Sequence, residues 1–144
     1  MLTYLDNCYF NRPSDNQSHI DVVLEIEAKL VVQNKVRHGE LKLAWSYIMD
    51  FENDANPFQD RKISIGPWRM LASVDTDVSE AVVARAEKLC EVGIREKDAL
   101  HVSCAIEAGC SFFLTTDRGI LKKSTFVTDL LILSPVDYVS HYDD

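Results

Sequence analysis

The sequence lacks long apolar runs, and none of its 144 residues belongs to a stretch near the roughly 18 apolar residues of a membrane-spanning helix. Its first residues lack the basic segment followed by an apolar one that marks a secretory signal. Low-complexity tracts and internal repeats are also missing. We therefore expect a cytoplasmic protein with no membrane partner, folded as one domain over residues 1–144.

Paired cysteines are lacking too. The four cysteines, Cys8, Cys90, Cys104 and Cys110, include no C-x-x-C pair. Neither a zinc site nor a disulfide framework is therefore indicated, and buried reduced thiols are expected.

Positive charge is scarce, with 15 Lys and Arg against 23 Asp and Glu and a formal net charge of −8. At first sight this balance argues against a nucleic-acid partner, because phosphate binding is normally driven by a basic surface. The objection weakens if several acids gather in one metal site, since bound divalent cations reverse the local charge. Only a local patch of Lys and Arg is then needed to hold a phosphate backbone.

The apolar pattern predicts alternating strands and helices. Short apolar runs predict strands at 2–5, 42–46, 69–74, 111–116 and 126–133. Helical spacing predicts helices at 19–36, 47–52, 78–91, 97–109 and 118–122, with a helical turn after Pro135, and leaves 60–68 ambiguous. This alternation predicts an α/β fold with a central parallel sheet and helices on both faces.

One helix carries a predicted cap. Asp77 and Glu80 have the spacing of a capping box for the helix at 78–91. The apolar stripe of that helix is predicted to consist of Val78, Val82, Ala86 and Leu89.

Four acids are expected at one edge of this sheet. Asp6 and Asp117 follow predicted strands, Glu52 lies on the helix that leaves the strand at 42–46, and Asp98 begins a helix. In an open parallel sheet, ligands bind outside the carboxyl ends of the strands. Carboxylates that meet there repel one another, and Mg²⁺ or Mn²⁺ would relieve the repulsion because both prefer oxygen ligands. Such a site can activate a water for attack on a phosphodiester.

The ordered set of motifs resembles the PIN-domain family. The motifs are Tyr4-Leu5-Asp6-Asn7, Ser46 with Glu52, Lys97-Asp98-Ala99-Leu100-His101-Val102 with Ala105, and Leu114-Thr115-Thr116-Asp117. The resemblance implies a three-layer α/β/α PIN-like fold and an endoribonuclease that uses Mg²⁺ or Mn²⁺. It assigns catalysis and metal binding to Asp6, Glu52, Asp98 and Asp117, with support from Asn7, Ser46 and Thr116.

The family also suggests partners. It includes the toxins of bacterial toxin–antitoxin pairs and RNA-processing nucleases, so single-stranded RNA, an antitoxin protein and a second copy of the chain are the candidates. The segment 6–13 looks like that of a PIN subgroup distinct from the well-studied toxins, because Asn7-Cys8 stands where many members carry Thr-Asn.

Substrate contacts are expected from Asn11, Arg12 and Arg118. A guanidinium can donate two parallel hydrogen bonds to a phosphate, which favours Arg12. Asn11-Arg12-Pro13 is also ordinary turn chemistry, and Arg118 could simply neutralise Asp117. For Arg61, Lys62 and Arg69 the alternatives are a basic rim or solvated side chains, and for His101 a place in the site or in the core.

Two other enzyme or signalling classes fit poorly. A haloacid-dehalogenase-type phosphatase requires a second Asp where Cys8 stands, and a phosphoacceptor receiver domain requires an acid where Asn7 stands. The serious alternative is a PIN scaffold that binds RNA or a protein partner without catalysis.

Overall fold

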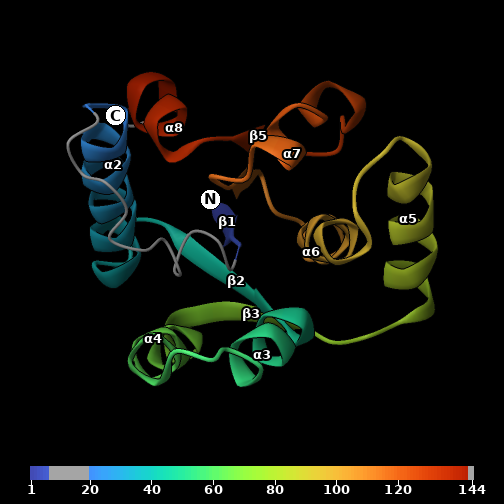
Figure 1. Cartoon of the computed structure of the whole chain (residues 1–144), viewed down its shortest axis with the longest axis horizontal. Coiled ribbons are helices and arrows are strands. Elements are labelled where there is room, and N and C mark those ends of the chain that lie inside the picture. Colours follow the sequence, from blue (N-terminus) through green and yellow to red (C-terminus); the bar gives the residue numbers. More distant parts are fainter. Residues whose placement is uncertain (7–19, 143–144) are drawn as a thin grey trace.

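The computed structural model describes residues 1–6 and 20–142, and its centre is a five-stranded sheet (Figure 1). The strands are β1 (Leu2–Leu5), β2 (Lys42–Ser46), β3 (Ala72–Thr76), β4 (Phe112–Leu114) and β5 (Leu131–Leu133). Their order is β3-β2-β1-β4-β5, and every neighbouring pair is parallel. The predicted parallel sheet is confirmed.

The three middle strands are buried along almost their whole length. Tyr4, Leu5, residues 43–45 and residues 112–114 all belong to the core. Parallel strands covered on both faces read as nearly continuous apolar runs. This is why they were recognisable in the sequence.

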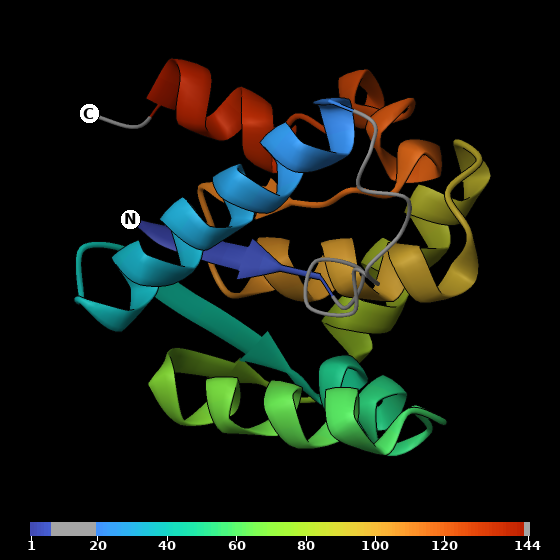
Figure 2. The same cartoon turned by 60° about the vertical axis from the view of Figure 1, so that its left-hand side comes forward.

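Helices cover both faces of the sheet (Figures 1 and 2). On one face α2 (Ile20–Arg37) packs against α8 (Pro135–Tyr142). On the other face α6 (Glu96–Glu107) lies next to the sheet, and α5 (Glu80–Glu91) packs against α6. The fold is therefore the three-layer α/β/α, PIN-like fold that the sequence predicts. No described helix has the length and apolar character needed to cross a bilayer.

The segment between β2 and β3 is more helical than predicted. It forms α3 (Tyr47–Asp54), α4 (Gln59–Ile65) and a 3₁₀ helix, η1 (Gly66–Leu71). The predicted strand at 69–74 is therefore wrong in its first half, and β3 begins only at Ala72. Pro67 stands at the start of η1, where its fixed φ and missing N–H are tolerated.

The last strand is also shorter than predicted. Ser124–Phe126 forms a 3₁₀ helix, η2, after the short helix α7 (Arg118–Leu121), and β5 pairs with β4 only over residues 131–133. The neighbouring strand β4 spans only three residues, so it can pair with only three residues of this segment.

The cap of α5 differs from the prediction. Ser79 is the N-cap, and its hydroxyl accepts from the backbone N–H of Val82 at 3.1 Å. Asp77 accepts only from the N–H of Val78, which precedes the helix and is 59% exposed. Val82, Ala86 and Leu89 form the buried stripe as predicted. The capping box and Val78 were misplaced because a serine two residues later offers the same chemistry.

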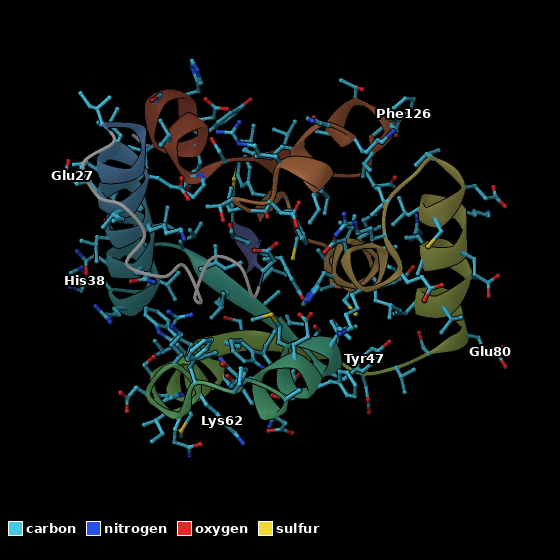
Figure 3. All side chains as sticks on the ribbon, viewed as in Figure 1. Glu27, His38, Tyr47, Lys62, Glu80 and Phe126 are labelled. Carbon is cyan, nitrogen blue, oxygen red and sulfur yellow. The ribbon has the colours of Figure 1, made fainter. Side chains whose placement is uncertain are left out.

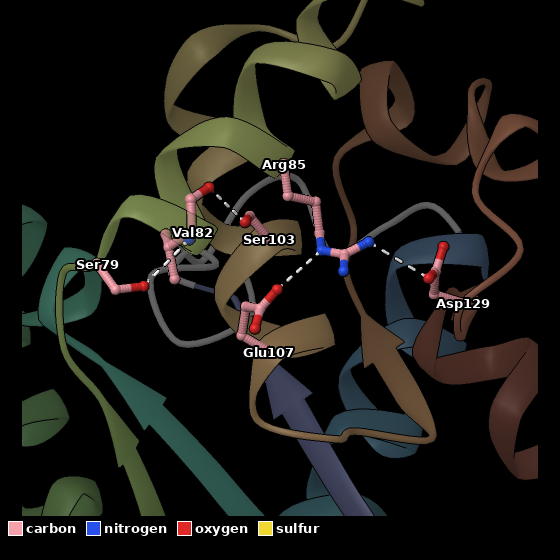
Figure 4. Close-up of polar contacts among 6 residues, drawn as sticks. All are labelled: Ser79, Val82, Arg85, Ser103, Glu107 and Asp129. Atoms are coloured by element: carbon pink, nitrogen blue, oxygen red, sulfur yellow. Dashed lines mark hydrogen bonds and ion pairs between the residues drawn. The ribbon is translucent and has the colours of Figure 1, made fainter.

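Polar contacts fasten α5 to α6 (Figure 4). The buried hydroxyl of Ser103 donates to the carbonyl of Val82 at 2.6 Å. Arg85 donates to Glu107 at 3.1 Å and to Asp129 at 3.3 Å, so it ties α5 to α6 and to the segment before β5. These contacts hold α6, which carries part of the candidate site.

The cap gives a direct test of this local structure. Ser79→Ala should lower the free energy of unfolding by about 1 kcal/mol, because one N–H of the first turn loses its acceptor. Asp77→Ala, the matched control, should have a smaller effect. Chemical denaturation of both variants measures this, and a larger loss in Asp77→Ala would contradict the assignment.

Candidate active site

The strand order reverses between β1 and β4. From β1 the chain proceeds to β2 and β3 on one side, whereas β4 and β5 lie on the other side. Such a switch point leaves a crevice outside the carboxyl ends of the two strands. Leu5 pairs with Leu114, so the next residues, Asp6 and Thr115, meet at this crevice.

Thr115 connects the two strand ends. Its hydroxyl donates to Asp6 Oδ2 at 2.6 Å and accepts from the backbone N–H of Asp117 at 2.9 Å. Asp6 is only 2% exposed, so this bond fixes the direction of a buried carboxylate. The sequence favoured Thr116 for this role, but Thr116 makes no side-chain hydrogen bond within the described residues. The register of β1 against β4, which singles out Thr115, was not visible in the sequence.

Asp117 is held by the helix that follows it. Its Oδ1 accepts from the N–H of Gly119 at 2.7 Å and of Ile120 at 3.3 Å, as the N-cap of α7. Its other oxygen makes no hydrogen bond with a described residue. That oxygen is available to a ligand.

A buried chain of hydrogen bonds leads to Glu52. His101 Nε2 makes a short hydrogen bond to Glu52 Oε1. The other ring nitrogen, Nδ1, lies 2.6 Å from the Tyr4 hydroxyl, which lies 2.6 Å from Ser46 Oγ. Ser46, expected to orient a carboxylate, therefore acts on Glu52 only through Tyr4 and His101.

The protons in this chain can be assigned from its partners. Burial raises the pKa of Tyr4 well above its ordinary value of 10.0, and the Asp6 and Glu52 carboxylates add to the rise. Tyr4 therefore keeps its proton and can donate it to His101 Nδ1 in the tautomer that carries its proton on Nε2. In that tautomer Nε2–H donates to Glu52, and the Ser46 hydroxyl can donate to Tyr4. His101 is thus both a satisfied core residue and a support for a candidate acid.

Neighbouring acids affect the pKa of Asp98. Its pKa is raised above 3.8, first by burial and then by Asp117, with a smaller contribution from Glu52, whereas His101 and Arg95 lower it. Carboxylates from α3, α6 and the β4–α7 connection therefore act on one another electrostatically. Such repulsion between acids is characteristic of metal and catalytic sites.

The described acids nevertheless do not form a complete metal-binding site. Among residues 1–6 and 20–142, no three His, Cys, Asp or Glu side chains are placed to hold one ion together. The expectation that Asp6, Asp98 and Asp117 lie within reach of one ion is not met in this arrangement. The physical reason is that Asp6 is bonded to Thr115 and Asp117 to α7, while like charges resist closer approach.

The donor set still suits a hard cation. Carboxylate oxygens are the ligands that Mg²⁺ and Mn²⁺ prefer, and Mg²⁺ commonly uses only one or two of them besides water and phosphate oxygens. Asp98 and the unbonded oxygen of Asp117 fit this requirement. The residues present are therefore compatible with such an ion.

The remaining described candidate residues from the sequence do not lie among these four acids. Asp50 accepts from Trp45 Nε1 at 2.9 Å and pairs with Arg69, which also binds Asp75, so neither Asp50 nor Arg69 is a free site residue. Thr116 and Arg118 line a separate hollow of about 280 Å³ beside α2 and α8. Asn7, Asn11 and Arg12 lie outside the described residues.

The three described cysteines are thiols and not candidate nucleophiles. Cys90, Cys104 and Cys110 are free thiols. Burial raises the pKa of Cys104 to about 11 and that of Cys110 to about 12, so both remain protonated at neutral pH. Neither is suited to act as a nucleophile.

Comparison with known proteins gives a fold-level match. No family model matches the sequence, and no curated protein is significantly similar to it. A solved structure, VapBC2 from Rickettsia felis bound to a DNA fragment from its promoter, is similar with a TM-score of 0.52 and 17% identity. The match covers 92% of this chain and 97% of the other. At this identity it supports the PIN-like fold and nothing finer.

The buried chain predicts a stability effect. Tyr4→Phe should lower the free energy of unfolding by about 1–3 kcal/mol, because Ser46 and His101 lose a buried partner. Tyr142→Phe, at an exposed ring without a hydroxyl hydrogen bond to a described residue, should change it little. Urea denaturation measures both, and equal stabilities would show that the chain is not formed.

Asp98 predicts a pH effect in metal-free protein. Its raised pKa means that the folded state holds the proton more tightly, so the carboxylate costs stability above the folded-state pKa. Asp98→Asn should therefore raise the melting temperature by a few degrees near neutral pH, at roughly 2–4 °C per kcal/mol. The gain should fade as the pH drops toward 3.8.

The matched control is Asp54→Asn, an exposed carboxylate on α3 whose side chain contacts no described charged group. It should show no such pH dependence. A destabilised Asp98→Asn protein at neutral pH in EDTA would mean that Asp98 is a structural residue.

Proposed function

We propose that this chain is a metal-dependent endoribonuclease of the PIN type, which cleaves single-stranded RNA at the crevice beside β1 and β4. Asp6, Glu52, Asp98 and Asp117 are the proposed catalytic acids. The observation that carries the proposal is the coupling of Asp98 to Asp117 and Glu52, three acids from separate elements at one end of the sheet. Acids that repel one another are characteristic of sites where a cation or a reacting group uses them.

The four acids are proposed to have different roles, which follow from their contacts. Asp98 and Asp117 are the proposed ligands of Mg²⁺ or Mn²⁺, since the two carboxylates lie close enough to repel each other. Asp6, oriented by Thr115, and Glu52, oriented by His101, are proposed to complete the ion's surroundings or to hold the attacking water. When bound, the ion supplies a water of lowered pKa and neutralises charge on the phosphate oxygens.

The buried chain of hydrogen bonds holds Glu52 in place. The hydrogen bond from His101 Nε2 fixes the orientation of the Glu52 carboxylate. Tyr4 binds the other ring nitrogen of His101, and Ser46 binds Tyr4, so both hold the imidazole in place. His101 is therefore a proposed positioning residue.

The likeness to VapBC2 favours a toxin–antitoxin setting. That structure is a complex bound to promoter DNA. We propose an antitoxin protein as a partner of this chain, in the cytoplasm. The competing function is a PIN scaffold that binds RNA or protein without cleaving, and the ordered hydrogen bonds at Asp6 and Glu52 favour catalysis over it.

Cleavage of labelled single-stranded RNA tests the proposal. Activity should require Mg²⁺ or Mn²⁺, disappear in EDTA, and fall at least about 100-fold in Asp6→Asn, beyond the roughly 10–100-fold typical of outer groups around a metal. Asp54→Asn is the matched control and should retain full activity.

Activity that survives both EDTA and Asp6→Asn would point to a contaminating nuclease or a different mechanism. If the purified protein binds RNA and never cleaves it under any of these conditions, the scaffold function is correct instead.

A further inference from the structure

A hollow of about 320 Å³ opens beside Glu52, between α3, the segment 55–58, α4 and the start of α6. Its walls include Phe51, Phe58, Arg61 and Lys97 as well as Glu52 itself. The volume is at the lower end of the roughly 300–1,000 Å³ typical of ligand sites. Lys97 immediately precedes Asp98, so the hollow borders the candidate active site.

Both aromatic rings of this hollow are exposed and carry a cation. Phe51 is 60% exposed, and Lys97 Nζ lies 5.9 Å from its ring centroid. Phe58 is 56% exposed, and the Arg61 guanidinium lies 4.4 Å from its centroid. Exposing two large rings at one place is costly unless a partner covers them.

The cations of the hollow are not neutralised by acids. Within the described part of the chain, Arg61 and Lys97 form no ion pair, whereas Arg69 and Arg85 each bind two carboxylates. On a chain with a net charge of −8, two unpaired cations at one hollow mark a local site for an anion.

Hydrogen bonds hold the platform in shape. The amide oxygen of Asn56 accepts from the N–H of Phe58 at 3.0 Å and fixes the turn through Pro57. Asn53 donates to the carbonyl of Lys62 at 3.3 Å, and Lys62 donates to that of Asp54 at 3.3 Å, which joins α3 to α4. A preformed surface loses little entropy on binding.

We propose that this hollow binds a nucleotide of single-stranded RNA next to the phosphodiester that is cleaved. A base stacks on Phe51 or Phe58, and Arg61 and Lys97 bind the flanking phosphates. Exposed rings combined with cations are the usual means of holding unpaired nucleotides. The inference rests on the proposed function for its substrate, but it concerns binding and not cleavage.

RNA fits these observations better than a protein partner does. A protein that covered two rings would not require two unpaired cations on them, whereas a nucleotide presents a flat apolar base and an anion together. Duplex RNA fits poorly, because its bases are stacked within the helix.

Fluorescence anisotropy tests the proposal with a short labelled oligouridylate. The measurement uses the Asp6→Asn protein, in which the RNA stays intact. Phe51→Ala and Phe58→Ala in that background should each weaken binding by about 5- to 160-fold, which corresponds to the loss of one stacking ring. The same sequence in a duplex should bind more weakly than the single strand.

Phe126→Ala is the matched control. Phe126 is also 60% exposed with a lysine, Lys123, 5.6 Å from its centroid. It lies across the molecule from Lys62 of α4 (Figure 3). Its loss should leave RNA affinity unchanged, which separates a specific platform from general stickiness of exposed rings.

The charged residues provide a second readout. Arg61→Ala and Lys97→Ala should each lower the slope of log affinity against log salt by about one, while Phe51→Ala leaves the slope nearly unchanged. Circular dichroism and melting temperature show whether each variant is folded.

The outcomes separate the two proposals. Unchanged RNA affinity in folded Phe51→Ala and Phe58→Ala proteins would overturn the platform, and the surface would then belong to another partner. Reduced affinity in a parent protein that never cleaves RNA would support the platform and refute the nuclease.

Discussion

The parallel pairing of β1 with β4 is the constraint on which the site depends. It sets Leu5 opposite Leu114, so the chain emerges from both strands at the same height with Asp6 against Thr115. Because β2 and β3 lie on one side and β5 on the other, no described strand covers this edge. A slip of one residue would turn Asp6 to the opposite face of the sheet and separate it from Thr115. The fold thus creates the crevice and directs one carboxylate into it at once.

Around that crevice, each acid is stabilised differently. Asp6 accepts from a hydroxyl, Asp117 from the first turn of a helix, and Glu52 from a buried imidazole. Asp98 accepts no hydrogen bond from a described donor, and its pKa is raised by burial and by the neighbouring acids. Repulsion among the acids therefore acts on Asp98, which follows Lys97 at the edge of the hollow beside Glu52. A bound cation would neutralise the acids, and a bound phosphate would neutralise the cations of the hollow.

The sequence predicted the features that depend on local pattern. Apolar runs located the buried strands, and the carboxyl-end rule placed Asp6 and Asp117 beside one crevice. The sequence does not provide the register between β1 and β4, which brings Thr115 to Asp6 in place of the Thr116 that the resemblance implies. Tyr4 was read only as a strand residue, because its hydrogen bond to His101 joins residues 97 positions apart. The cap of α5 was misplaced because Asp77 and Ser79 both offer suitable oxygens, and only the chain path decides between them.

The central claim is that the acids at this edge bind one divalent cation, and a crystal soaked in Mn²⁺ tests it most directly. We predict an anomalous difference peak within coordination distance of the Asp98 and Asp117 carboxylates, roughly 2.0–2.2 Å for a hard divalent ion of this size. Asp6 and Glu52 should lie beside it or reach it through water. A crystal in which Mn²⁺ occupies other surface acids while this crevice stays free of any peak would contradict the claim.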